Sequence, residues 1–194
     1  MTVETTGFTR TIEGRTTPAP GKYVIDPAHT RVGFVARHMM VSKVRGHFGE
    51  FEGSFTVGER PEDSSVNVTV HAASIDTNQP DRDGHLRSAD FLHTEEHPTL
   101  AFRSTSVEPA GDSWQISGDL TIRGTTRPAV LDVDFEGATA DALGDPNKPR
   151  AGFTASTRVN RHDFGLAWDQ RLETGGFVVG PAITIELEVE GVGQ

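Results

Sequence analysis

Apolar and polar residues alternate along most of the chain after Tyr23, which is the period of a strand with one buried face. The clearest case is AITIELEVE at 182–190, where Ile183, Ile185, Leu187 and Val189 fall on one face and threonine and glutamates on the other. The same pattern runs through three further segments, and more weakly through four others: 65–72, 114–122 and 129–137, then 31–39, 48–57, 99–107 and 151–160. The sequence therefore predicts about eight strands.

Glycine, proline, asparagine and aspartate separate these segments, and helical periodicity is scarce. Many short strands with such turn residues between them are typical of an antiparallel sandwich or a closed barrel. The 194 residues suit one domain with a sizeable core. We expect an all-β domain over residues 21–194, preceded by a flexible, threonine-rich arm over residues 1–20 that ends in TTPAPG.

Charge and composition exclude several classes of protein. The net charge is −10 and lysine and arginine form no block, which disfavours a groove for nucleic acid or an anionic membrane surface. Without cysteine there is no disulfide framework, thiolate metal site or cysteine nucleophile. The first residues do not resemble a signal peptide, and no run of ~18 apolar residues follows, so a cytoplasmic protein without membrane insertion is expected.

The motifs of common enzymes are missing. The sequence contains no GxSxG, HExxH, GxGxxG or GxxxxGK[ST]. His93 and His97 have helical spacing and could bind a metal together with His85, but Pro98 would end a helix there. Hydrogen-bonded structural histidines are the simpler interpretation, so no catalytic residue, metal or cofactor is expected.

Residues 81–92 (DRDGHLRSADFL) are the most polar cluster of the chain, with three acids, two arginines and one histidine. A partial apolar face within 85–93 predicts a short helical segment here. Acids and arginines so close in sequence usually pair with one another, and no sequence feature marks a carboxyl group with a raised pKa. The segment could be an active site, a metal site or a structural closure.

The order of motifs along the chain resembles the YceI-like family of lipocalin-like, polyisoprenoid-binding proteins. The resemblance covers about residues 22–190, and RDGHLRSADF, GDLTIRGTTRPAV and NRHDFG together are its most specific part. It implies an antiparallel, roughly eight-stranded barrel that binds a long apolar chain, such as an isoprenoid quinone or polyprenyl lipid, for transport, storage or sequestration. It also implies a possible homodimer. Many similar proteins look exported, whereas this chain shows no signal peptide.

Eleven of the fourteen aromatic residues are phenylalanine, which suits either a filled core or an interior that binds hydrocarbon. About eight strands can likewise enclose either side chains alone or one small ligand. If the barrel binds a lipid, the predicted ligand-contacting residues are the apolar ones expected to point inward or to lie at the mouth: Val32, Phe34, Ala36, Met39, Phe51, Phe55, Val68, Leu86, Phe91, Leu92, Phe102, Leu120, Val133, Phe153, Phe164, Trp168 and Ile185.

Residues 81–92 would then form a helical lid near the barrel mouth, with Leu86, Phe91 and Leu92 facing inward. Arg82, Asp83, His85 and Arg87 would contact a lipid head group or only close the barrel end, and Arg161 would pair with Asp83 or Asp90. Two alternatives stay open besides lipid binding: a metal- or acid/base-assisted enzyme acting on such a lipid, and a structural barrel with a filled core.

Overall fold

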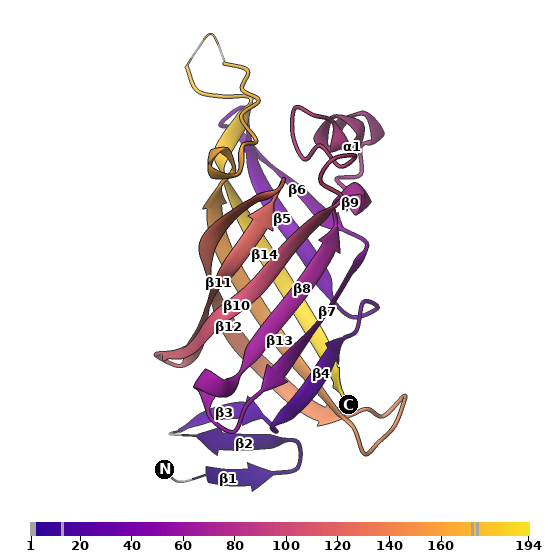
Figure 1. Ribbon diagram of the computed structural model, residues 1–194, viewed down its shortest axis with the longest axis vertical. Helices are drawn as coiled ribbons and strands as arrows, with labels where there is room; N and C mark the ends of the chain where they lie inside the picture. Colours follow the sequence, from indigo (N-terminus) through magenta and orange to yellow (C-terminus); the bar gives the residue numbers. More distant parts are fainter. Residues whose placement is uncertain (1–2, 13, 172, 174) are drawn as a thin grey trace.

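The computed structural model describes residues 3–12, 14–171, 173 and 175–194 (Figure 1). Its strands are β1 Val3–Thr6, β2 Thr9–Ile12, β3 Arg15–Pro18, β4 Gly21–Ile25, β5 Arg31–His38, β6 Ser42–Phe48, β7 Phe51–Val57, β8 Ser65–His71, β9 Ile75–Asp76, β10 Thr99–Ala110, β11 Ser113–Ile122, β12 Thr125–Ala140, β13 Pro149–Asn160 and β14 Val179–Gly193. The helical elements are α1 Pro80–Arg87 and the 3-10 turns η1 Pro61–Asp63, η2 Ala72–Ser74 and η3 Arg161–Phe164.

Eight of these strands form a closed antiparallel barrel in the order β13-β12-β11-β10-β8-β7-β4-β14, with β14 pairing back onto β13. β14 also runs along both β4 and β5, so β4 and β5 are successive parts of one wall. β6 and β9 extend that wall beyond β5. The expected all-β class and roughly eight-stranded barrel are confirmed.

The strands β1, β2 and β3, which begin at Val3, form a three-stranded antiparallel meander where the sequence predicts a flexible arm. Figure 1 shows the meander across one end of the barrel, beneath β7 and β8. Arg15 Nε donates to the Gly111 carbonyl in the β10–β11 turn at 2.8 Å, and Arg10 donates to Gly58 and Glu59 between β7 and β8. We call this the meander end of the barrel. The division of the chain at residue 20 stays a prediction.

The opposite end carries α1, the β11–β12 turn and η3, and we call it the helix end. Arg123 in that turn joins the three, because its guanidinium donates to the carbonyls of Ala89 and Gly165 at 2.8 Å each. Arg123 and Gly124 have positive φ angles of 48° and 66°, as a tight two-residue hairpin turn requires. The three motifs that carry the family resemblance therefore meet at one end of the barrel.

The predicted short helix is present, but it begins at Pro80 and ends at Arg87 instead of running through 85–93. Proline suits the first helical position because its missing N–H would have no partner there, and Gln79 caps the helix by accepting from Arg82 N. Among the described residues no helix is long and apolar enough to cross a membrane.

Candidate binding cavity

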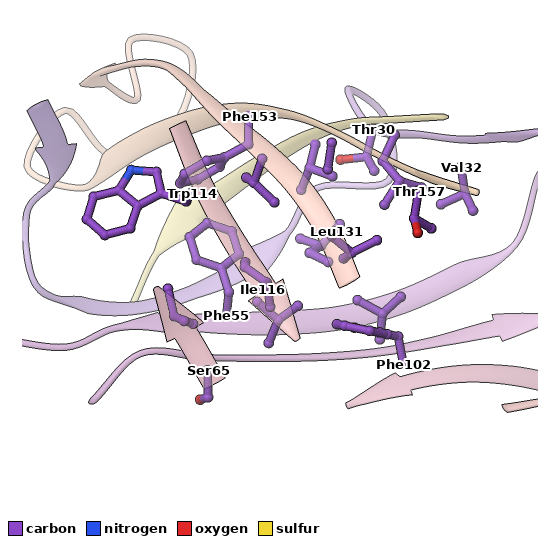
Figure 2. Close-up of a pocket in the computed structure, with 18 of the residues that line it drawn as sticks. Thr30, Val32, Phe55, Ser65, Phe102, Trp114, Ile116, Leu131, Phe153 and Thr157 are labelled. Atoms are coloured by element: carbon purple, nitrogen blue, oxygen red, sulfur yellow. The ribbon is translucent and has the colours of Figure 1, made fainter. Parts of the chain in front are cut away.

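The interior of the barrel is not filled: a cavity of about 240 Å³ lies between its walls. One buried water needs only about 10–15 Å³, so this space is far larger than a packing defect. Apolar side chains from opposite walls converge on it, among them Phe55, Trp114, Phe153 and Leu131 (Figure 2). Such a space can receive a hydrocarbon chain, and a structural barrel with a filled core does not describe this interior.

The alternation seen in the sequence places these side chains because neighbouring strands pair in register. Phe153 lies opposite Phe135 on β12 and Val189 on β14, and all three point into the barrel. β10 carries a bulge between Ser104 and Ser106, which changes the side of the strand that faces inward. Phe102 and Val107 therefore both line the cavity although their numbers differ in parity.

Ten of the residues predicted to contact a ligand line this cavity. They come from β5, β7, β8, β10, β11, β12, β13 and β14: Val32, Phe34, Phe51, Phe55, Val68, Phe102, Leu120, Val133, Phe153 and Ile185. Their inward orientation is as expected from the period-two pattern, while their contact with a ligand stays a prediction.

The other seven apolar residues of that prediction lie away from the cavity: Ala36, Met39, Leu86, Phe91, Leu92, Phe164 and Trp168. Leu92 and Phe164 are buried in the core, and Leu86 packs against it. Phe91 is buried too, and Trp168 packs on it with ring centroids 5.4 Å apart.

Ala36 is near the end of β5, and Met39 is 43% exposed in the turn after it. These side chains are therefore separate from the cavity wall: some fill the helix end, and Met39 faces outward.

The polar side chains of 81–92 hold the helix in place. Asp83 is buried and accepts from the backbone N–H and the hydroxyl of Thr77. Arg82 donates to the Thr77 hydroxyl and carbonyl at 2.7 and 2.8 Å. Arg87 donates to the carbonyls of Ala73 and Ile75, at 2.7 Å each.

The mutual pairing of acids and arginines expected within this segment is therefore wrong for Arg82 and Arg87, which bind a hydroxyl and backbone carbonyls. His85 does pair with an acid, Asp90, at 2.9 Å, and its ring packs on Phe91 and Trp168. None of the four polar residues predicted as head-group or lid contacts lines the cavity. The segment packs Leu86 and Leu92 against the core at the helix end. Closure of the barrel end stays a prediction, and so does a direct head-group contact, which the cavity does not support.

The sequence predicted that Arg161 would pair with Asp83 or Asp90. The structure shows that it does not. It is 3% exposed and donates to the carbonyls of Leu166, Val179 and Gly180, and its acidic partner is Asp169. The NRHDFG motif is structural here. Asn160 caps η3 by accepting from His162 N, and Gly165 ends it in the left-handed conformation.

Sequence reasoning missed many residues at the cavity, and two groups of them are informative. Trp114, Ile116 and Leu131 line it and lie on apolar faces that the alternation had identified, so the pattern could have included them. Four residues of the meander also line it: Arg10, Ile12, Thr17 and Pro18. No signal in the sequence distinguishes these four, because their neighbours across the barrel end are distant in the chain.

The structure brings His93 and His97 together with Glu96, not with His85, and their ligand atoms lie within 4.8 Å of one another. His93 Nδ1 is 3.2 Å from Glu96 Oε2. None of the three lines the cavity. This group therefore lies away from the apolar interior.

Comparison with known proteins matches residues 23–191 to the YceI-like domain. Protein YceI of Escherichia coli O17:K52:H18 is 40% identical over 170 residues, which cover 86% of this chain and 83% of that protein. The chain belongs to the YceI-like family. The meander, with Arg10, precedes the matched domain.

Two solved structures share this YceI-like fold. BcnA of Burkholderia cenocepacia superposes with a TM-score of 0.74 at 20% identity, covering 86% of this chain and 98% of that one. A polyisoprenoid-binding domain from Saccharophagus degradans, implicated in plant cell wall breakdown, has a TM-score of 0.62 at 11% identity, covering 91% of this chain and 100% of its own. At these identities the likeness supports the fold.

Proposed function

We propose that this YceI-like barrel binds one long-chain isoprenoid lipid inside its cavity. The observation that carries the proposal is the cavity itself, which is lined by apolar side chains from every side of the barrel (Figure 2). The polyisoprenoid-binding domain of Saccharophagus degradans, which has the same fold, lends further support.

The energetics suit such a ligand. Burial of one methylene group stabilises by about 0.8 kcal/mol, so a five-carbon isoprene unit contributes roughly 4 kcal/mol before ordering and desolvation costs. A few units are enough for firm binding without many polar contacts. Selectivity then depends on the length of the cavity and on the groups at its ends.

A binding protein is favoured over an enzyme because the polar groups at the helix end are committed to structural bonds. Asp83 and Arg82 hold Thr77, and His85 holds Asp90. A reaction on the lipid would require acid, base or metal ligands at the cavity wall, and these three side chains do not line it. Transport, homodimer formation and a cytoplasmic location stay predictions.

The test compares two alanines on the same face of β13. Ala155 lines the cavity, whereas Ala151 is fully buried in the core outside it. We expect Ala155→Phe to project into the cavity and lower the affinity for farnesol at least tenfold, with little loss of stability. Ala151→Phe should overpack the core and cost ~1–3 kcal/mol, yet its folded fraction should bind farnesol like the wild type.

Trp114 lines the cavity and provides the readout. In a Trp168→Phe background it is the sole tryptophan, since the chain contains two. Farnesol titrations followed by its fluorescence give the affinity, and urea unfolding gives the stability. If the wild type does not bind farnesol, or if Ala155→Phe binds it equally well, the proposal is wrong.

A further inference from the structure

Among the described residues that line the cavity, Arg10 is the one charged side chain. It comes from β2 of the meander and is 4% exposed. A charged group is rarely placed against an apolar interior, because its desolvation is costly unless its hydrogen bonds are satisfied. The packing of the barrel alone does not explain why a charged side chain is buried at this position.

The hydrogen bonds of Arg10 are incomplete. Its two Nη atoms donate to the carbonyls of Gly58 and Glu59, and Nη1 also lies 3.1 Å from the Glu59 carboxylate. Its Nε is buried and has no hydrogen-bond partner. An unsatisfied buried donor costs about 1–3 kcal/mol, and an oxygen acceptor that reached it would remove that cost.

The Glu59 side chain does not neutralise Arg10 fully, because it is 82% exposed and water screens its charge. The positive charge of Arg10 also acts on the hydroxyl group of Tyr23, which is buried on β4. Burial raises the pKa of the Tyr23 hydroxyl, and the nearby Arg10 guanidinium opposes that rise. A negatively polarised atom would therefore be stabilised at this end of the interior.

Other polar groups of the cavity wall also gather at the meander end. Thr17 is on β3, and Thr56 and Ser65 form the last pair of the β7–β8 hairpin, next to Ser64. The helix end of the cavity has no charged side chain among the described lining residues. Hydroxyl groups also occur elsewhere on the wall, at Thr30 and Thr157, so it is the charge that distinguishes the meander end among the described lining residues.

We propose that Arg10 is the head-group anchor of the cavity: it binds the terminal oxygen of an isoprenoid ligand at the meander end, with the hydrocarbon chain pointing towards α1. This inference rests on the proposed function and adds the polarity and orientation of the ligand. Since its hydrogen bonds to Gly58 and Glu59 use only three of the five N–H groups of the guanidinium, the anchor suits an oxygen acceptor, such as a hydroxyl or carbonyl group.

The experiment uses three ligands with the same isoprenoid chain: farnesene, which has no oxygen, farnesol and farnesoic acid. Each is titrated into the full chain with Trp114 fluorescence as the readout. The wild type should bind farnesol more tightly than farnesene. Arg10→Met should lower the affinity for farnesol about tenfold and leave farnesene unchanged, because farnesene has no oxygen for Arg10 to bind.

Arg15→Met is the matched control, since Arg15 also ties the meander to the rim but does not line the cavity. It should bind all three ligands like the wild type. Glu59→Gln tests the charge without touching the interior, because this side chain is exposed. By freeing Arg10 of its carboxylate, it should raise the affinity for ionised farnesoic acid severalfold relative to farnesol.

Several results would overturn the anchor while leaving lipid binding intact. These are equal wild-type affinities for farnesene and farnesol, an equal loss of both in Arg10→Met, and no change in the farnesoic acid to farnesol ratio in Glu59→Gln. If the wild type binds none of the three ligands, the proposed function fails as well.

Discussion

At the scale of single residues, we expect substitution of Arg161 to lower the stability of the fold strongly. It is buried and serves three backbone carbonyls, at Leu166, Val179 and Gly180. Arg161→Met would remove the donor to these carbonyls and the guanidinium that pairs with Asp169. We expect a loss of roughly 3 kcal/mol in the free energy of unfolding, measured by urea denaturation.

Arg158→Met is the control for Arg161, because Arg158 is close in sequence but exposed on β13, just before η3. It should change the free energy of unfolding by less than about 0.5 kcal/mol. Equal stabilities of the two variants would mean that the Arg161 hydrogen bonds contribute nothing.

Arg161 also shows where prediction from sequence ends. The NRHDFG motif marks the residue as important, but its partners include carbonyls of β14 and Asp169, which no local pattern specifies. Arg10 is the stronger case, because it lies in a segment that the sequence describes only as an arm. Partners chosen by tertiary packing leave no periodic signal, whereas side-chain alternation does.

At the scale of elements, α1 is held by Asp83, which accepts two hydrogen bonds from Thr77. We expect Asp83→Ala to release the helix from β9, so that amide hydrogens of residues 77–87 exchange about tenfold faster or more. Farnesol affinity should stay within about twofold of the wild type, because Asp83 does not line the cavity.

Asp81→Ala is the control that separates the Asp83–Thr77 hydrogen bonds from the general effect of an acid at a helix N-terminus. Asp81 and Asp83 both lie in the first turn, but only Asp83 is buried. Asp81→Ala should leave exchange nearly unchanged. A large loss of farnesol affinity in Asp83→Ala would instead indicate that residues 81–92 contact the ligand.

The strands were predictable because alternation and turn residues are local features. The barrel walls at 65–72, 114–122, 129–137 and 182–190 follow the expected pattern closely. The bulges in β10 and β12 were not predictable, since each depends on the register of the neighbouring strand. The same holds for the meander, whose position is fixed by rim contacts with residues distant in the chain.

At the scale of the whole molecule, the barrel closes where its last strand, β14, lies between β13 and its first strand, β4. We call this junction the seam. Arg150 on β13 clamps this seam. Its guanidinium binds Asp26 after β4, Glu190 on β14 and Asp141 after β12. One cation thus joins three acidic partners that are far apart in sequence, beside the backbone ladder of β13 and β14.

This clamp predicts how stability depends on pH. Hydrogen bonds from Arg150 and His29 lower the pKa of Asp26 from 3.8 to about 2, and Arg150 also lowers the pKa of Asp141. A carboxyl group with a depressed folded-state pKa stabilises the fold above its unfolded pKa, and that stabilisation is lost as the pH falls. We expect Asp26 to contribute on the order of 1 kcal/mol at neutral pH after solvent screening, and to lose it between about pH 4 and pH 2.

Arg150→Gln should therefore lower the free energy of unfolding at pH 7 and flatten its fall between pH 4 and pH 2, as followed by urea denaturation at each pH. The control is Arg60→Gln. Arg60 also pairs with acids, Glu62 and Asp63, but all three side chains are exposed. Breaking that exposed pair should leave both the stability and its pH dependence nearly unchanged. If Arg150→Gln keeps the acid sensitivity of the wild type, the carboxyl groups at the seam do not control closure, and acid must open the barrel elsewhere.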